Sequence, residues 1–273
     1  MNLKESLKSR LSKKEMGQMP RAFDIIGNIA IIEIPSTLKK KEKLIAQTLL
    51  NNNKGVTTVL NKSSGFKGRL RTRKLRFIAG IKTKETEYRE NGCVFRFNVE
   101  TSYFSPRLSS DRLEIAKMVK KGEKVLVMFS GVSPYPISIA KNSQAGEVYA
   151  IELNRTASKY AVKNVEMNKL KNVTIIQGDV RKKIPELKRK KLIFDRIIMA
   201  RPQLKDSFLE DAKKVSRKGT IVHFHDFLPE QEMPGAAIEK IKKVFPKARI
   251  MGWKKIGDIG IRRYRIRVDF KVL

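Results

Sequence analysis

The first hundred residues carry short runs of β-branched and aromatic residues that are separated by turns rich in Gly, Ser and Asn. Residues 22–34 predict two strands around a Gly-Asn turn, and residues 37–52 predict a helix with one apolar face. Residues 1–19 have apolar positions at helical spacing and predict one basic amphipathic helix. We therefore expect a small α+β domain over residues 1–100.

After residue 100, apolar runs alternate with amphipathic stretches. Strands are expected at 124–131, 147–153, 173–180, 194–200 and 219–227, with helices between them. These strands are apolar on both faces, as is typical of a parallel sheet covered by helices on both sides. The last two strands, 248–256 and 263–272, are expected to form an antiparallel edge. Residues 101–273 therefore predict an α/β, Rossmann-like fold with a doubly wound, mostly parallel sheet.

Charge changes this picture by indicating a partner. The chain has 60 Lys and Arg against 27 Asp and Glu, a net charge of +33, spread along most of its 273 residues. A field of this size favours a polyanion, and we favour a nucleic acid over an anionic membrane. No apolar run approaches the roughly 20 residues of a membrane span, and the start lacks the apolar centre of a secretion signal. A soluble, cytoplasmic protein is expected.

Cysteine and histidine are scarce. The single cysteine, Cys93, excludes an intrachain disulfide and a cysteine-built metal site, and its surroundings indicate a strand core rather than a nucleophile. His223 and His225 lie two apart, so they point to one face of a strand. With no further ligand in view, we interpret them as a structural pair and expect no metal site.

Three strand ends carry residues that fit a nucleoside. The turn after the first parallel strand contains Gly131, the second strand ends in Glu152, and the third ends near Asp179. Backbone can approach a ligand at the turn, Glu152 can accept both ribose hydroxyls, and Asp179 can accept from an adenine amino group. Neither GxGxxG nor a Walker motif is present, so no phosphate grip is indicated. The combination predicts an S-adenosylmethionine site, which also includes Tyr103, Phe129, Ser130, Val132, Asn154 and Val180.

A basic stretch in the small domain is a candidate RNA contact. Arg71 and Arg73 are expected to alternate on one strand face and to track phosphates, together with Lys74. The alternative is a solvated edge strand that charge protects from aggregation. The last strand allows the same two interpretations for its arginines, Arg262, Arg263, Arg265 and Arg267.

Several motifs resemble one family. The pieces "RTRKLRFIAG", "YFSPRLSSDR", "MFSGVSPY", "YAIELNRTA", "GDVR" and "IVHFHDF" resemble the archaeal/eukaryal-type tRNA (guanine-37-N1)-methyltransferases and their relatives that build wybutosine by aminocarboxypropyl transfer. The resemblance runs from about residue 3 to the end. It implies a class I methyltransferase domain, a tRNA substrate and a monomer. It also implies that this chain starts after the N-terminal domain with which many members grip the tRNA elbow.

The resemblance assigns roles to particular positions. Arg107 would lie near guanine O6 and stabilise negative charge, Asp111 would be the general base, and the following residue, Arg112, would contact substrate. The loop that positions the target base would be Ala200-Arg201-Pro202. Arg201 would compensate for a missing amide by reaching a phosphate or O6.

Four positions depart from the family pattern. Asp111 stands where the family has Glu, Val127 where it has Asp, Ser133 where it has Gly, and Ala200 where it has Asn. A carboxylate that is one methylene shorter, and the loss of an amide, put rate or substrate choice in doubt, because a misplacement of about 1 Å costs roughly 10²-fold in rate.

Three functional hypotheses follow. The leading one is methyl transfer from S-adenosylmethionine to N1 of guanine 37 in tRNA. The second is aminocarboxypropyl transfer to a wybutosine-type base at the same position, although Ser105-Pro106-Arg107 and Ser133-Pro134 match the methyltransferases. The third is a tRNA-binding protein with divergent or lost turnover, which predicts that Glu at 111 and Asn at 200 restore nothing.

Overall fold

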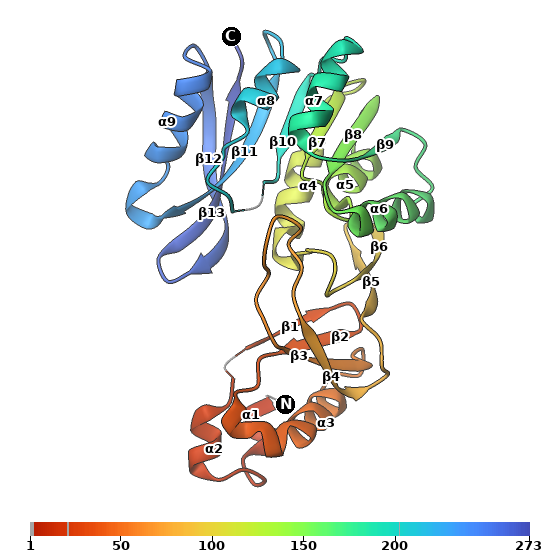
Figure 1. Cartoon of the computed structure of the whole chain (residues 1–273), viewed down its shortest axis with the longest axis vertical. Helices are drawn as coiled ribbons and strands as arrows, with labels where there is room; N and C mark the ends of the chain where they lie inside the picture. Colours follow the sequence, from red (N-terminus) through yellow and green to blue (C-terminus); the bar gives the residue numbers. More distant parts are fainter. Residues whose placement is uncertain (1–2, 21, 202) are drawn as a thin grey trace. The chain divides into compact units, whose positions relative to one another are not determined.

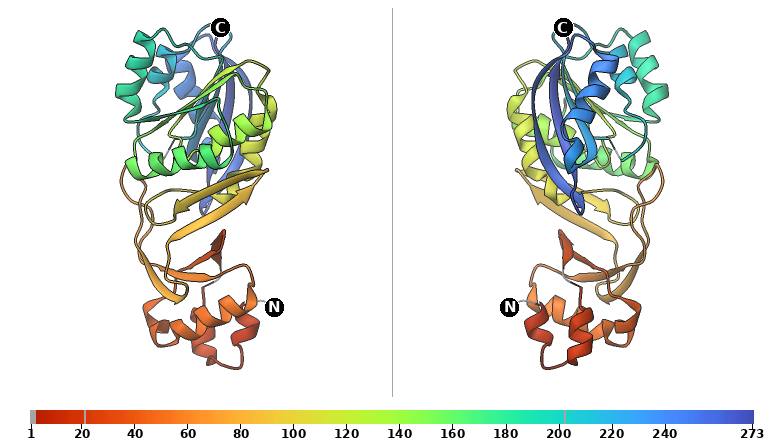
Figure 2. Two further views of the ribbon diagram at one scale, coloured as in Figure 1. Left: turned by 90° about the vertical axis from the view of Figure 1, so that its right-hand side faces the viewer. Right: turned by 90° about the vertical axis from the view of Figure 1, so that its left-hand side faces the viewer.

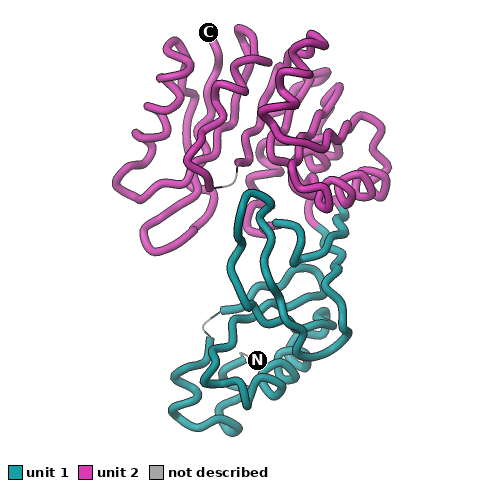
Figure 3. The backbone as a smooth tube through the Cα atoms, viewed as in Figure 1, with its two compact units in different colours: residues 1–89, 94–103 teal, residues 90–93, 104–273 magenta. Residues whose placement is uncertain are grey.

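The computed structural model describes residues 3–20, 22–201 and 203–273 and divides into two compact units (Figure 3). One unit comprises Met1–Arg89 and Val94–Tyr103, and the other comprises Glu90–Cys93 and Phe104–Leu273. The turn of one hairpin is thus grouped with the second unit while most of both its strands are grouped with the first. In the described parts of the chain, no helix is long and apolar enough to cross a membrane.

The first unit combines a mixed sheet with helices. Its elements are α1 (Leu3–Leu7), α2 (Lys13–Gln18), β1 (Phe23–Ile26), β2 (Ile29–Ile32), η1 (Ser36–Lys41), α3 (Glu42–Asn52), β3 (Thr58–Lys62) and β4 (Leu75–Gly80). The strand order is β1-β2-β3-β4, with only β2 and β3 parallel. Apolar residues of α1 and α3 pack with β2 and β3 in one core. A separate hairpin, β5 (Glu85–Glu90) and β6 (Cys93–Asn98), follows.

The predicted single helix over residues 1–19 is wrong. The chain forms two short helices, α1 and α2, because Ser12 caps a new helix start. The Ser12 side chain accepts from the Glu15 N–H at 3.3 Å, and the Glu15 carboxylate accepts from the Ser12 N–H at 2.8 Å. This reciprocal capping box fixes a helix N-terminus inside the apolar pattern, which continues across it.

The second unit is built on a seven-stranded sheet of order β12-β13-β11-β10-β7-β8-β9 (Figure 1). Its strands are β7 (Lys124–Met128), β8 (Glu147–Glu152), β9 (Val173–Gln177), β10 (Arg196–Met199), β11 (Ile221–Pro229), β12 (Arg249–Gly260) and β13 (Arg263–Lys271). Strands β7, β8, β9, β10 and β11 pair in parallel with one another, whereas β13 pairs antiparallel with both β11 and β12. The predicted doubly wound sheet with an antiparallel edge is confirmed.

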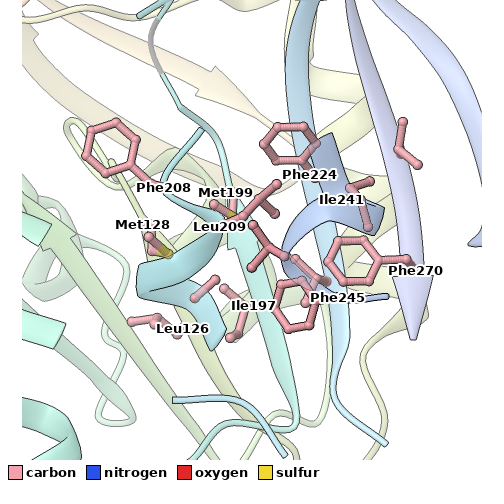
Figure 4. Packing of buried hydrophobic residues seen from close by; sticks show 14 of the residues in the cluster. Leu126, Met128, Ile197, Met199, Phe208, Leu209, Phe224, Ile241, Phe245 and Phe270 are labelled. Atoms are coloured by element: carbon pink, nitrogen blue, oxygen red, sulfur yellow. The ribbon is translucent and has the colours of Figure 1, made fainter. Parts of the chain in front are cut away.

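Helices cover both faces of this sheet (Figure 2). They are η2 (Pro106–Leu108), α4 (Ser109–Met118), α5 (Pro134–Asn142), α6 (Arg155–Met167), α7 (Val180–Arg189), α8 (Leu209–Lys214), η3 (Glu230–Glu232) and α9 (Gly235–Val244). Apolar residues of α4 and α5 pack on one face of β7 and β10, and those of α7, α8 and α9 pack on the other. Figure 4 shows the second core, where Phe224, Phe245 and Phe270 gather beside Ile241. Each fully buried side chain of this kind stabilises the fold by about 1.5–3 kcal/mol.

Connectivity places a ligand site at one edge of the sheet. The chain runs from β7 outward to β8 and β9, then returns across to β10 on the other side of β7. The crossovers therefore diverge between β7 and β10. In open α/β sheets, ligands bind outside the carboxyl ends of the strands at such a switch point.

Candidate active site

The turn that follows β7 has an unusual backbone. Phe129, Gly131 and Ser133 all adopt left-handed conformations, with φ of 65°, 58° and 66°. The Ser130 N–H donates to the Ile151 carbonyl at 2.9 Å, which ties the turn to the end of β8. For a residue other than glycine this conformation costs roughly 1–2 kcal/mol. Such strain is typically concentrated at functional sites.

Glu152 closes this corner of the sheet. Its Oε2 accepts from the Gly131 N–H and its Oε1 accepts from the Asn154 N–H, each at 2.7 Å. Burial raises the pKa of the Glu152 carboxyl, and the two backbone donors oppose that shift. The structure thus brings together Gly131, Glu152 and Asn154, three residues predicted to bind the cofactor. The proposed acceptance of ribose hydroxyls stays a prediction.

Two polar residues at helix starts complete the corner. Asn154 caps α6 by accepting from the N–H groups of Thr156 and Ala157, and Asp179 caps α7 by accepting from Arg181. Sequence reasoning missed Asn164, a fully buried residue on α6 whose side-chain amide donates to the Val132 carbonyl at 3.1 Å. An Asn on the apolar face of an amphipathic helix is the signal that marks it. The corner is therefore held by hydrogen bonds to the backbone.

In the loop that follows β10, Arg201 has a local structural role. Arg201 is 2% exposed, and it donates to the Asp226 carboxylate at 2.7 Å and to the Asp206 carbonyl at 2.8 Å. Its guanidinium thus holds its own loop, and any contact with a phosphate or O6 stays a prediction. Ala200 packs against the core beneath α4, and Pro202 lies outside the described residues.

Asp111 lies on the buried side of α4, where it is 3% exposed. Its Oδ1 accepts from Arg267 Nη1 at 2.5 Å, and its Oδ2 accepts from the Tyr135 hydroxyl at 2.6 Å. The Nε2 atom of His225 lies 3.6 Å from Oδ2. Burial and the neighbouring arginines lower the pKa of His225 well below its usual value, so this ring is neutral.

The interpretation of Arg265 and Arg267 as solvated or RNA-tracking arginines is wrong. Both are buried, at 5% and 2% exposure, because β13 lies between β11 and β12 and is not an edge strand. Arg267 pairs in register with His225 on β11 and faces α4. Sequence spacing carries no signal for a contact between residues 111 and 267.

Arg107 and Arg112 flank the start of α4 in different environments. Arg107 is exposed on η2, whereas Arg112 is 1% exposed. Arg112 forms two hydrogen bonds with Glu90, at 2.5 and 2.6 Å, and it also donates to the Ser105 carbonyl. The structure gives Arg112 a structural contact within this unit, and its contact with substrate stays a prediction.

In the first unit, the predicted shared strand face of Arg71 and Arg73 is wrong. Strand β4 begins only at Leu75, and Arg71 sits in a turn with φ of 53°. Arg73 is 9% exposed and donates to the Val99 carbonyl at 3.0 Å, whereas Lys74 is exposed. Arg71 stacks over the ring of Tyr103 at 4.9 Å. Phosphate binding by Arg71 and Lys74, and cofactor binding by Tyr103, stay predictions.

The comparisons with known proteins match both parts of the chain. A family model described as the TRM5/TYW2 methyltransferase domain matches residues 86–251, and one described as the TYW2 N-terminal domain matches residues 3–83. The chain belongs to the TRM5/TYW2 methyltransferase family.

Two curated relatives and one solved structure illustrate the similarity. The chain is 40% identical over 258 residues to tRNA (guanine(37)-N(1))-methyltransferase Trm5b of Pyrococcus abyssi, covering 93% of this chain and 76% of the relative. It is 33% identical over 306 residues to tRNA (guanine(37)-N(1))/4-demethylwyosine(37)-methyltransferase Taw22 of Nanoarchaeum equitans, covering 92% and 100%. It is also similar to aTrm5 in its complex with tRNALeu, with a TM-score of 0.86, 26% identity, and coverage of 100% of this chain and 78% of that one.

The structure shows the environment of three residues that depart from the TRM5/TYW2 family pattern. Ser133 adopts a left-handed backbone with φ of 66°, a conformation that favours glycine. Val127 is fully buried beneath α4 and α5. Asp111 sits in an ion pair with Arg267 rather than in an open position. These side chains therefore lie in the turn after β7, in the core of the sheet and in a buried ion pair.

Proposed function

We propose that this chain is a tRNA methyltransferase that transfers the methyl group of S-adenosylmethionine to N1 of guanine 37. The observation that carries this proposal is the pair of carboxylates on one strand-end side of the sheet. Glu152 is fixed by backbone donors at the turn after β7, and Asp111 is fixed by side chains under α4. Together they suit a nucleoside and a proton acceptor, which N-methylation of a weakly acidic ring nitrogen requires.

The cofactor corner fits its ligand. The left-handed turn after β7, the buried hydroxyls of Ser130 and Ser133, and the Glu152 carboxylate form a polar corner without a phosphate grip. Neither hydroxyl has a hydrogen-bond partner among the described residues. When bound, S-adenosylmethionine supplies an electrophilic methyl group on a positive sulfur. The chain's part is to orient it through Glu152 and the turn backbone.

Asp111 would take the proton of guanine N1. A carboxylate has about four lone-pair sites, and Arg267 and Tyr135 occupy two of them, so two remain to accept a proton. As the proton moves to Asp111, the N1 electron pair would form the bond to the methyl carbon, while the carbon–sulfur bond of S-adenosylmethionine would break and leave its electron pair on the sulfur. Arg107 would stabilise the negative charge that grows on O6.

Transfer RNA is the partner that suits the charge and the family. The net charge of +33 favours a polyanion, and Arg71 and Lys74 present cations on the first unit. Stacking of Arg71 on Tyr103 adds an aromatic surface of the kind that bases use.

A labelling experiment tests the proposed function. Purified protein and unmodified tRNA are incubated with S-adenosylmethionine that is labelled either on the methyl carbon or on the aminocarboxypropyl carbons. Methyl label in the tRNA, and none from the second cofactor, is expected. A tRNA carrying adenine at position 37 is the control, and equal labelling of that control contradicts the proposal.

The second candidate function is aminocarboxypropyl transfer to a wybutosine-type base. The match of residues 3–83 to the TYW2 N-terminal domain favours it. Ser105-Pro106-Arg107 favours methyl transfer instead, since the resemblance places that arginine at O6. Label from the aminocarboxypropyl carbons in tRNA that carries 4-demethylwyosine would establish this activity.

A further inference from the structure

We propose that Arg267, on the last strand of the sheet, is the positioning residue for the Asp111 carboxylate. The proposal rests on the function proposed above, in which Asp111 accepts the N1 proton. It assigns a role in the reaction to a residue 156 positions away in the sequence.

The guanidinium of Arg267 binds three carboxylates at once. Its Nη1 donates to Asp111 at 2.5 Å, its Nη2 donates to Glu114 at 2.6 Å, and its Nε donates to Asp269 at 2.9 Å. Asp111 and Glu114 lie three residues apart on α4, so they share one face of the helix. A planar group with fixed donor directions can satisfy this arrangement, whereas a single ammonium cannot.

Arg267 is the cation that the Asp111 carboxylate shares with its two acidic neighbours. Lys254 pairs with Glu114, and Arg267 serves all three carboxylates, so three anions face two cations. Burial lowers the pKa of both nearby histidines, His223 and His225, so they add no positive charge at neutral pH. Among the described residues, Arg267 is the only charged cation paired with Asp111.

A second set of contacts holds Arg267 itself. Asp269 accepts from Arg267 and lies 2.7 Å from Nδ1 of His223. Nε2 of His223 lies 2.7 Å from Nη1 of Arg196, which can only donate, so Nε2 is the acceptor and Nδ1 carries the proton toward Asp269. Arg196 is anchored by Glu123 at 2.7 Å. The chain of contacts therefore fixes the direction of the Arg267 side chain from beneath.

This arrangement explains how an aspartate serves where the family has a glutamate. The shorter side chain places its oxygens nearer to α4, and Arg267 meets them there from the sheet. The second donor to Asp111, the Tyr135 hydroxyl, fixes the other carboxylate oxygen. Removal of Arg267 would free the carboxylate to rotate, and misplacement by about 1 Å lowers rates by roughly 10²-fold.

The test compares variants of the full-length protein in single-turnover methyl transfer to tRNA. Arg267→Met is expected to lower the transfer rate by about 10²-fold, with the KM for tRNA and for S-adenosylmethionine within about twofold of wild type. Arg267→Lys keeps the positive charge but not the planar, multidentate donor group, so its loss of rate is expected to be smaller than that of Arg267→Met. Arg217→Met removes an exposed arginine paired with Asp195, and it is expected to leave the rate unchanged.

Two further variants separate positioning from a purely structural role. In an Asp111→Asn background, Arg267→Met is expected to cause no additional loss of rate, because both changes remove the same placed carboxylate. Asp269→Asn alters a carboxylate that contacts Arg267 and His223, and it is expected to give an intermediate loss. Unchanged rates in folded Arg267→Met protein, or additive losses in the double variant, would overturn the proposal.

Failure of the proposed function would look different. Transfer by the wild type to a nucleoside other than guanine 37 overturns the proposed function, and the rates of the variants at that nucleoside still decide the role of Arg267. Absence of any transfer by correctly folded wild-type protein overturns both.

Discussion

The two carboxylates proposed to serve the reaction are held in opposite ways. Glu152 accepts from backbone N–H groups 21 and 2 residues away, whereas Asp111 accepts from side chains 156 and 24 residues away. The cofactor corner is therefore built from the turn and helix starts that surround it. The proposed catalytic corner, around Asp111, is built from α4, α5 and the last strand. Substitution of neighbouring side chains leaves backbone N–H donors in place, so the position of Glu152 should tolerate it. The same kind of substitution removes the donors that hold Asp111.

The largest expected effect lies in the catalytic corner. Asp111→Asn keeps the shape of the side chain but cannot accept the N1 proton as a carboxylate does, so the rate of methyl transfer is expected to fall by about 10²–10⁴-fold. Affinity for tRNA and for cofactor is expected to stay near the wild-type values. Single-turnover rates measure the first, and filter binding with calorimetry measures the second. Asp195→Asn, at the opposite end of the sheet, is the control, and equal losses in both would contradict the base role.

In the cofactor corner, the expected effect is on binding. Glu152→Gln replaces an oxygen acceptor by an amide donor that faces one of the two backbone N–H groups. Hydrogen bonds to charged groups contribute about 1.5–3 kcal/mol, so affinity for S-adenosylmethionine should fall by roughly tenfold to a hundredfold. Calorimetry with the cofactor checks this. Glu147→Gln, an exposed residue on the same strand, is expected to bind normally. Equal affinities in the two variants would count against the ribose role.

In the first unit, two double variants that remove the same charge from different places test whether the basic turn binds tRNA. Arg71→Gln combined with Lys74→Gln should weaken tRNA binding for all sequences, and it should lower the slope of log affinity against log salt by about one for each lost phosphate contact. Lys13→Gln with Lys14→Gln removes the same two charges from α2 and is the control. A slope that changes equally in both double variants would show that net charge, and not the basic turn, carries binding.

Acid pH should lower the free energy of unfolding, because two buried histidines lie beside Asp111 and Arg267. Burial lowers the pKa of His223 and His225, so the unfolded chain binds protons at these residues at a higher pH than the folded protein does. Their contribution is full above about pH 6.5 and is lost as the pH falls below it, at no more than about 1.4 kcal/mol per pH unit for each histidine. Urea unfolding between pH 7 and pH 5 measures this. His225→Leu should make the dependence shallower, and an unchanged slope would argue against a neutral buried ring.

The smallest effect is expected at the strained turn. Ser133→Gly removes a side chain from a left-handed position, so the free energy of unfolding should rise by up to about 1 kcal/mol. Ser138→Gly, inside α5, should lower it by about the same amount. Chemical denaturation of both variants provides the comparison. Loss of stability in Ser133→Gly would show that its buried hydroxyl matters more than the backbone strain.

The same contrast explains what the sequence could predict. Alternating apolar runs predicted the succession of strands and helices and the parallel sheet, and strand-end spacing predicted that the Gly131 turn and Glu152 would meet. These relations are local or follow from strand order. The pairing of Asp111 with Arg267 depends on where the last strand inserts, and periodicity does not encode that insertion.

Two local errors have equally physical causes. A capping box at Ser12 interrupted an apolar pattern that continues across it. The basic stretch around Arg71 read as a strand, but a left-handed turn occupies it, and the strand begins four residues later at Leu75. In both places short-range hydrogen bonds or turn geometry took precedence over the hydrophobic period.

The central claim is methylation of guanine 37 at N1 through Asp111. Mass spectrometry of nucleosides from tRNA that has reacted with wild-type protein and S-adenosylmethionine tests it most directly. The account predicts N1-methylguanosine at position 37, and its loss when the protein carries Asp111→Asn. Methyl groups on another atom or position, or equal amounts of N1-methylguanosine from the variant, would contradict it.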